Sequence, residues 1–223
     1  MNLGNGRVIA VGDVHGCLPA LRALLAAIEP QPEDTIVTLG DYIDRGPDSR
    51  GVLDELIALR RQCQLVPLRG NHDELLLEIC AGDRSLFDVW LPFGGKATVQ
   101  SYGGHVPEGI PQQHVDFLEQ CRPFYQTPTH FFLHGSYLAH LPLEQQPSDI
   151  LYWDSLRERL PGPHCSGKLA IVGHTAQRNG EILDLGYLKC IDTCCYGDGW
   201  LTALEVASGQ TWQADKAGKM KEE

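Results

Sequence analysis

The sequence comprises 223 residues with a formal net charge of −11 at pH 7. This length suits one α/β domain with a substantial core, and the acidic balance argues against nucleic acid or an anionic membrane surface as a partner. Residues 1–6 contain no apolar signal region, and no later stretch is long enough to span a membrane. We therefore expect a cytoplasmic protein whose eight cysteines are reduced thiols.

The first half of the chain alternates between strand and helix patterns. Apolar runs predict strands over 7–11 and 35–39, and leucines at helical spacing predict a helix over 18–28 between them. This is the pattern of a βαβ unit with parallel strands. A second helix from about Asp48 leads to a strand over 64–68, where Pro67 indicates an edge or irregular position because proline lacks an N–H.

After these elements, the next helix is predicted to open at Asn71 and to end near Gly82. Residues 83–110 show no clear period and are predicted to form a helical cap or insert, followed by a helix over 111–122. Strands are then predicted over 131–133, 169–172, 187–191 and 200–206. We expect a single domain over 1–212 and a flexible tail over 213–223.

Five of the predicted strands end in side chains that can bind metal or phosphate. These are Asp13 and His15 after the first strand, Asp41, Asp44 and Arg45 after the second, Asn71 and His72 after the third, and then His134 and His174. In open α/β sheets, ligands bind beyond the carboxyl ends of the strands. These side chains are therefore expected to share one crevice.

Taken in order, the strand-end motifs resemble those of a known family. The sequences GDVHG, GDYIDRG and RGNHD, together with the later His134 and Gly173-His174, are similar to the phosphoprotein phosphatase branch of the calcineurin-like metallophosphatases. The small prokaryotic and bacteriophage lambda phosphatase group is the most similar type. The resemblance implies an α/β fold in which a two-sheet β-sandwich is flanked by helices.

The resemblance also implies a dinuclear metal site. Asp41 would bridge two divalent ions, with Asp13 and His15 completing the first site and Asn71, His134 and His174 the second. Mixed imidazole and carboxylate ligands suit manganese, with iron or zinc as alternatives. A hydroxide bridging the two ions would then attack phosphorus in line.

Further roles follow from the same resemblance. His72, held by Asp44, would protonate the leaving group, and Arg45 would bind phosphate oxygens through its planar guanidinium, with Asn71 beside the phosphate. Arg69 either faces phosphate or forms an ion pair with Asp44 or Asp73. Relatives carry a Trp-x-Arg arginine that binds phosphate, whereas here Trp153-Asp154 is followed by Ser155. Arg157 is the candidate to replace that arginine, and Arg159 is the alternative.

These features predict a metal-dependent phosphatase that hydrolyses phosphomonoesters, with phosphoserine or phosphothreonine on proteins as the leading substrates and small phosphoesters also possible. One alternative is a diadenosine tetraphosphate hydrolase, and another is an inactive scaffold of the same fold. The symmetrical tetraphosphate hydrolases typically place Asn at the position of Asp44, which favours the phosphomonoesterase. Retention of all the motif residues argues against the scaffold. No oligomeric state is predicted.

Overall fold

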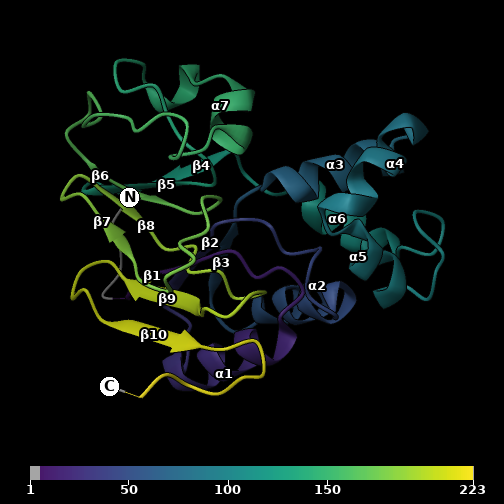
Figure 1. Ribbon diagram of the computed structural model, residues 1–223. Coiled ribbons are helices and arrows are strands. Elements are labelled where there is room, and N and C mark those ends of the chain that lie inside the picture. Colours follow the sequence, from purple (N-terminus) through teal and green to yellow (C-terminus); the bar gives the residue numbers. More distant parts are fainter. Residues whose placement is uncertain (1–5, 223) are drawn as a thin grey trace.

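The computed structural model describes residues 6–222, which form two five-stranded sheets packed face to face (Figure 1). The first sheet has the order β10-β9-β1-β2-β3, and the second has the order β4-β5-β6-β8-β7. The first sheet contains β1 (Val8–Val11), β2 (Thr35–Thr38), β3 (Gln64–Pro67), β9 (Leu201–Glu205) and β10 (Thr211–Ala214). The second contains β4 (Phe124–Gln126), β5 (His130–Leu133), β6 (Leu169–Val172), β7 (Leu183–Asp184) and β8 (Leu188–Cys190).

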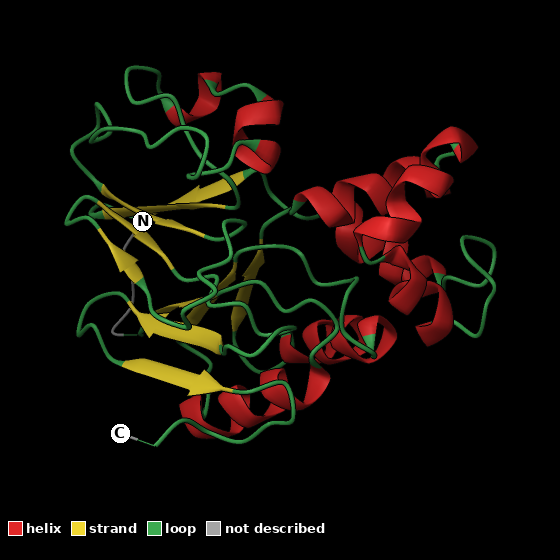
Figure 2. Cartoon of the chain, viewed as in Figure 1, coloured by secondary structure: helices red, strands yellow, loops and turns green. Residues whose placement is uncertain are grey.

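Helices cover the sandwich and extend from one side of it (Figure 2). They are α1 (Leu18–Ile28), α2 (Ser49–Leu59), α3 (Asn71–Cys80), α4 (Phe87–Trp90), α5 (Gly95–Ser101), α6 (Gln112–Glu119) and α7 (Ser148–Trp153). Short 3₁₀ turns are η1 (Arg84–Leu86), η2 (Leu91–Phe93) and η3 (Leu143–Gln145). The expected two-sheet α/β architecture flanked by helices is therefore confirmed.

The side chains of each strand point alternately to the two faces of its sheet, so one face packs against helices and the other against the second sheet. Ile9 and Val11 pack with the helices of the first sheet's outer face, whereas Ala10 faces Phe132 and Ile171 of the second sheet. Successive strand residues point to opposite faces, so a strand that is apolar throughout must be covered on both sides. Strands β1, β2 and β3 are parallel to one another, as are β5, β6 and β8. Pro67 lies in β3, at the edge of its sheet, as predicted.

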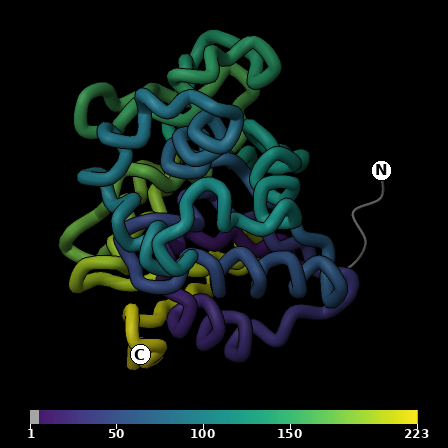
Figure 3. Tube along the Cα trace, turned by 90° about the vertical axis from the view of Figure 1, so that its right-hand side faces the viewer, coloured from purple at the N-terminus to yellow at the C-terminus, as the bar shows by residue number. Residues whose placement is uncertain are grey.

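The residues between α3 and α6 form a helical group at one side of the sandwich. In Figure 3, where that side faces the viewer, the blue and teal coils of this group lie in front of the strands. Residues 83–110, expected to be a helical cap or insert, contain η1, α4, η2 and α5. Trp90 is fully buried in this group and belongs to the same core cluster as α1 and α2.

The C-terminal segment is more ordered than the sequence indicated. Gln213 and Ala214, expected to begin a flexible tail, instead belong to β10, which pairs with β9. Ala214 also forms a bridge with Met220, so the chain folds back on itself after the strand. This pairing corrects the predicted start of the tail. Among residues 6–222, no helix combines the length and apolar character needed to cross a membrane.

Candidate active site

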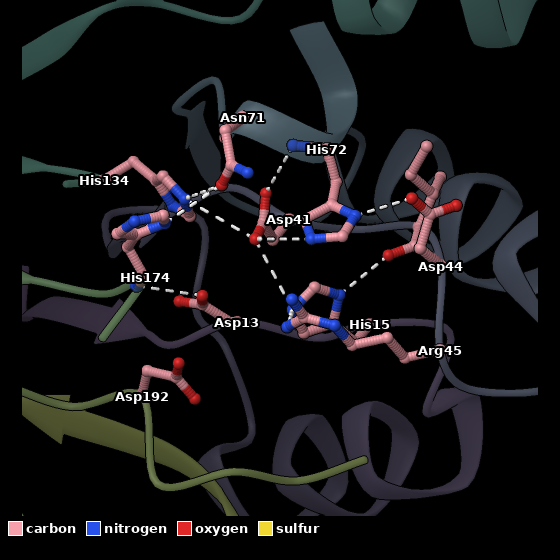
Figure 4. Close-up of polar contacts among 12 residues, drawn as sticks. Asp13, His15, Asp41, Asp44, Arg45, Asn71, His72, His134, His174 and Asp192 are labelled. Atoms are coloured by element: carbon pink, nitrogen blue, oxygen red, sulfur yellow. Dashed lines mark hydrogen bonds and ion pairs between the residues drawn. The ribbon is translucent and has the colours of Figure 1, made fainter. Parts of the chain in front are cut away.

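The parallel strands bring the predicted strand-end residues to one rim of the sandwich (Figure 4). Parallel strands of a sheet present their carboxyl ends on the same side, and here both sheets contribute. The side chains gathered at this rim are Asp13 and His15 after β1, Asp41 after β2, Asn71 at the start of α3, His134 after β5 and His174 after β6. Residues more than 150 positions apart thus meet: the His174 N–H donates to Asp13 Oδ2 at 2.9 Å.

Several of these residues have an unusual backbone. The left-handed conformation, which costs free energy for any residue with a Cβ, occurs at His15 (φ 42°), Asp41 (φ 51°), Asp44 (φ 71°), Arg45 (φ 67°) and His174 (φ 61°). Adjacent glycines permit close approach, since a Cβ on Gly173 would lie 2.1 Å from Asp13 Oδ1. Such strain concentrated at one rim is typical of functional sites.

Each of three rim histidines is tied through one ring nitrogen to a backbone carbonyl. The pairs are His15 Nδ1 with Ile43 O at 2.8 Å, His134 Nδ1 with Leu39 O at 2.8 Å, and His174 Nε2 with Trp153 O at 3.1 Å. A carbonyl only accepts, so these nitrogens carry the proton and the opposite nitrogen presents a lone pair to the centre. Burial lowers the pKa of His15 and His134 and lowers that of His174 to about 4, which favours the neutral, ligating form.

The lone pairs of His134 and His174 face other acceptors rather than donors. Asn71 Oδ1 lies 3.0 Å from both His134 Nε2 and His174 Nδ1, and Asp41 Oδ2 lies 3.5 Å from His134 Nε2. On its other side, Asp41 Oδ2 lies 3.4 Å from His15 Nε2. With the histidine protons committed to carbonyls, no proton stands between these atoms, and a cation satisfies them. The donor set therefore fits two divalent ions that share Asp41.

Two groups of side chains have ligand atoms close enough to hold an ion. One contains Asp41, His134 and His174, and the other contains His15, Asp41 and His72. Asp13 belongs to neither group: its Oδ2 accepts the His174 N–H, and its buried Oδ1 has no hydrogen-bond partner among the described residues. That free oxygen remains available as a ligand beside His15.

Positive charge already lies against the group that contains His15. Arg45 Nη1 donates to His15 Nε2 at 2.6 Å, and its guanidinium carbon lies 4.6 Å from the centre of the Tyr196 ring. The lone pair of His15 therefore receives a cationic group in this structure. Tyr196 was not identified from the sequence, because nothing in the local pattern indicates which aromatic ring will stack on an arginine.

His72 and Asp44 form a buried pair beside these groups. His72 Nδ1 donates to Asp44 Oδ2 at 2.6 Å, and its Nε2 lies 4.0 Å from Asp41 Oδ2. Burial disfavours the imidazolium, but the charges of Asp41 and Asp44 outweigh it and raise the pKa of His72. Asp44 also accepts from Trp90 Nε1 at 2.7 Å and Thr98 Oγ1 at 2.6 Å, two residues that the sequence did not identify as functional.

Two predicted phosphate-binding arginines make other contacts. Arg69 donates to the carbonyl oxygens of Leu118 and Glu119 at the end of α6, at 3.3 and 2.9 Å. The ion pair with Asp44 or Asp73, one of the two roles predicted for Arg69, does not occur among the described residues.

Asp73 instead accepts the N–H groups of Asp41 and Gly70, at 2.8 and 3.0 Å, and so fixes the turn that carries Asp41. Burial and the charge of Asp41 raise the pKa of Asp73 to about 8.

Arg157 donates to the carbonyl of Ala176, two residues beyond His174. Arg159 instead forms an ion pair with Asp154. The Ser155 hydroxyl, at the position where relatives carry an arginine, lies 3.3 Å from Thr175 Oγ1. Arg45 is thus the arginine within residues 6–222 that hydrogen-bonds a member of the two groups.

Asp192 is a buried carboxylate at the same rim that the sequence did not single out (Figure 4). Its Oδ1 accepts the Cys194 N–H at 3.0 Å, and its Oδ2 has no hydrogen-bond partner among the described residues. Burial raises the pKa of Asp192 to about 6, and burial followed by the charge of Asp192 raises that of Asp13. The sequence pattern that identified the other rim residues, a polar side chain just beyond a buried strand, is also present at Asp192, which follows β8.

Asp192→Asn is expected to stabilise the metal-free protein while weakening its affinity for divalent ions. Removing one of two neighbouring buried charges relieves repulsion, and about 1 kcal/mol would raise Tm by roughly 2–4 °C. Loss of negative charge beside Asp13 should weaken Mn²⁺ binding by roughly tenfold. Thermal melts in chelator and titration calorimetry measure both effects, with the exposed Asp198→Asn as control. A lower Tm with unchanged affinity would contradict this role.

The chain is similar to known phosphoesterases. Residues 6–178 match the family model described as calcineurin-like phosphoesterase. Serine/threonine-protein phosphatase 1 of Salmonella typhimurium strain LT2 is 31% identical over 209 residues, which cover 89% of this chain and 91% of that protein. A symmetrical bis(5'-nucleosyl)-tetraphosphatase of Pectobacterium atrosepticum is 49% identical over 73 residues, but these cover only 32% of this chain and 25% of that enzyme.

Solved structures show the same fold at low identity. A crystal structure provisionally described as a diadenosine tetraphosphatase superposes with a TM-score of 0.71 at 23% identity, covering 95% of this chain and 94% of that one. The cold-active protein-tyrosine phosphatase of a psychrophile Shewanella species gives a TM-score of 0.68 at 16% identity, covering 98% and 80%. At such identities the likeness extends to the fold alone.

Proposed function

The chain belongs to the calcineurin-like phosphoesterase family, and from this premise we propose that it is a phosphomonoesterase of the phosphoprotein phosphatase type. Its leading substrates are phosphoserine and phosphothreonine in proteins. The observation that carries the proposal is the buried His72–Asp44 pair, because a serine or threonine alkoxide is strongly basic and needs a proton as it leaves. A relative that is 31% identical and matches 89% of this chain is a serine/threonine-protein phosphatase.

We propose that Asp41 is shared by two divalent ions of the manganese class. His134, His174 and Asn71 fit one ion, while His15 and the free oxygen of Asp13 fit the other. When bound, such ions supply Lewis acidity, which polarises phosphoryl oxygens and activates water. The carbonyl contacts of the three histidines fix the ring orientations in advance, so little ordering is required on binding.

Arg45 is placed to bind the phosphate. Its guanidinium contacts both His15 and the Tyr196 ring, at the edge of the histidine groups. Two N–H groups in one plane match two phosphate oxygens, which a lysine cannot reproduce. Stacking on Tyr196 holds the plane while leaving the edge free to donate.

His72 is placed to deliver the proton. Its Nδ1 proton is committed to Asp44, and its Nε2 faces the side where Asp41 and Arg45 lie. The proton on Nε2 would pass to the leaving oxygen as the P–O bond breaks, and the carboxylate of Asp44 would stabilise the imidazolium before transfer. Arg45 and His72 would therefore act on opposite ends of the breaking ester, one on phosphate and the other on the alcohol.

Hydrolysis of dinucleoside polyphosphates is the second candidate, since a tetraphosphatase shares 49% identity over part of the chain. A nucleotide phosphate is a weakly basic leaving group that requires little protonation, so the His72–Asp44 pair would add little there. We therefore favour the phosphomonoesterase.

The kcat/KM for a phosphothreonine peptide is expected to exceed that for diadenosine tetraphosphate on the metal-reconstituted protein. Asp44→Asn should narrow this gap, because the peptide reaction depends more strongly on the proton donor. Steady-state kinetics on both substrates measure the ratio, with Asp198→Asn as an exposed control. A tenfold or greater preference of the wild type for the dinucleotide would overturn the phosphoprotein assignment and leave the fold and family unaffected.

A further inference from the structure

We propose that Trp90 and Thr98, which lie in the helical group between α3 and α6, are positioning residues for proton transfer at His72. Both act through Asp44 and touch no reacting atom. The inference rests on the proposed phosphomonoesterase function and assigns a task to residues 83–110. That segment carries no strand-end motif, and the family motifs quoted from the sequence leave Trp90 and Thr98 without a role.

Asp44 receives donors on both carboxylate oxygens. Oδ2 accepts from His72 Nδ1 at 2.6 Å and from Trp90 Nε1 at 2.7 Å, while Oδ1 accepts from Thr98 Oγ1 at 2.6 Å. All three distances are short, as expected for bonds to an ionised acceptor. Asp44, Trp90 and Thr98 are fully buried, so water cannot replace a lost donor. The orientation of the carboxylate therefore depends on the two residues from the helical group.

Thr98 also fixes the backbone of Asp44. The Asp44 N–H donates to Thr98 Oγ1 at 2.9 Å and to Ser49 Oγ at 3.1 Å, and these two hydroxyls lie 2.9 Å apart. Since Thr98 gives its proton to Asp44 Oδ1, its lone pairs accept from the backbone and from Ser49. One hydroxyl thereby holds both the main chain and the side chain of a residue in the left-handed conformation (φ 71°).

Gly94 and Gly95, in the segment that joins Trp90 to Thr98, pack closely against the turn that carries Asp44 and Arg45 and against the Trp90 ring. The Arg45 N–H donates to Gly94 O at 3.2 Å, and a Cβ on Gly94 would lie 2.8 Å from the Arg45 nitrogen. A Cβ on Gly95 would lie 2.4 Å from the Trp90 ring. Only glycines allow this segment to contact both the turn and the indole so closely. The segment therefore acts as a rigid support for Asp44 and, through Asp44, for His72.

The first test compares substrates that differ in their need for a proton. Thr98→Val keeps the shape of the side chain and removes its donor, whereas Trp90→Phe replaces the indole donor with a smaller aromatic ring. Each should lower kcat for a phosphoserine peptide by roughly 10- to 100-fold. The loss for p-nitrophenyl phosphate should be much smaller, because its leaving group needs little protonation. KM and metal content should be unchanged. Thr98→Ser, which keeps the hydroxyl, should restore most of the turnover.

Matched controls separate positioning from packing. Thr35→Val removes a buried hydroxyl in β2 whose partner is Gln64, and Trp212→Phe alters an indole in β10. Both should leave the ratio of the two substrates unchanged. Equal losses on both substrates for Thr98→Val and Trp90→Phe would overturn the inference. If Thr98→Val does not fold, Trp90→Phe and Thr98→Ser decide the outcome. The quantity compared is again the turnover of the phosphoserine peptide relative to that of p-nitrophenyl phosphate.

The second test asks whether the effect passes through His72. In a His72→Asn background, Thr98→Val and Trp90→Phe should cost less than about threefold in turnover, because the group they position is absent. Independent losses would overturn the inference.

A readout that needs no activity is the His72 Nδ1 proton in ¹H–¹⁵N spectra, assigned by its absence in His72→Asn. It should be far downfield in the wild type and shift or disappear in Thr98→Val and Trp90→Phe. An unmoved resonance would overturn the positioning role, whereas inactivity of the wild type would overturn only the proposed function.

Discussion

Removal of divalent cations is expected to reduce phosphomonoester hydrolysis to the level of the uncatalysed control, and added Mn²⁺ is expected to restore it. The physical reason is the cluster of acceptors around Asp41, which contains buried lone pairs and a carboxylate with no protons between them. Such a cluster binds a cation strongly and has no nucleophile of its own. Elemental analysis after reconstitution should give two ions per chain.

Asp41→Asn should produce the same loss without added chelator. This substitution removes the charge that both groups share, so affinity for both ions should fall together, which titration calorimetry can measure. The exposed Asp198→Asn serves as the matched control and should retain activity and both ions. Full activity with no metal bound, or with one ion per chain, would show that the shared-ligand arrangement is wrong.

His72→Asn is expected to cut turnover of a phosphoserine peptide by roughly 10²–10⁴-fold while leaving two ions bound. The imidazole is fixed by Asp44 at 2.6 Å, and removing it leaves the alkoxide without a proton donor. An aryl phosphate should lose much less, because its leaving group is a weaker base. Single-turnover kinetics on both substrates separate the chemical step from product release.

The metal content of His72→Asn distinguishes a proton donor from a ligand. His72 lies in one of the two groups whose atoms are close enough to hold an ion, so loss of one ion in the variant would mean that it ligates instead. The exposed His140→Asn provides a control for the loss of an imidazole. Similar losses on the peptide and the aryl phosphate would also count against the acid role.

Much of the site could be predicted because its residues follow local patterns. Asp13, Asp41 and His134 each stand one to three residues beyond the end of a buried strand, and parallel strands bring their ends together whatever the details of packing. Asp192 follows the same rule, since it lies two residues beyond β8, but it belongs to none of the family motifs. The edge strands β4, β7 and β10 were missed because they are partly exposed and their residues do not form an apolar run.

The contacts of the arginines and of the helical group could not be predicted. Arg69 reaches carbonyls of α6 that lie about 50 positions away, and Asp44 receives donors from Trp90 and Thr98 across similar separations. Long side chains and aperiodic segments have no local pattern that specifies a partner.

By itself, the sequence determined the main strands and most of the rim residues at their ends, because strand periodicity and glycine-bounded turns are local properties of the chain. The two-sheet architecture followed from the resemblance of its ordered motifs to a known family. Only the tertiary structure decided which histidine nitrogen faces the centre, which carboxylates keep a free oxygen, and which residues hold Asp44. Each of those depends on a hydrogen bond between segments far apart in sequence. Such bonds form only where packing has excluded water and left a single partner within reach.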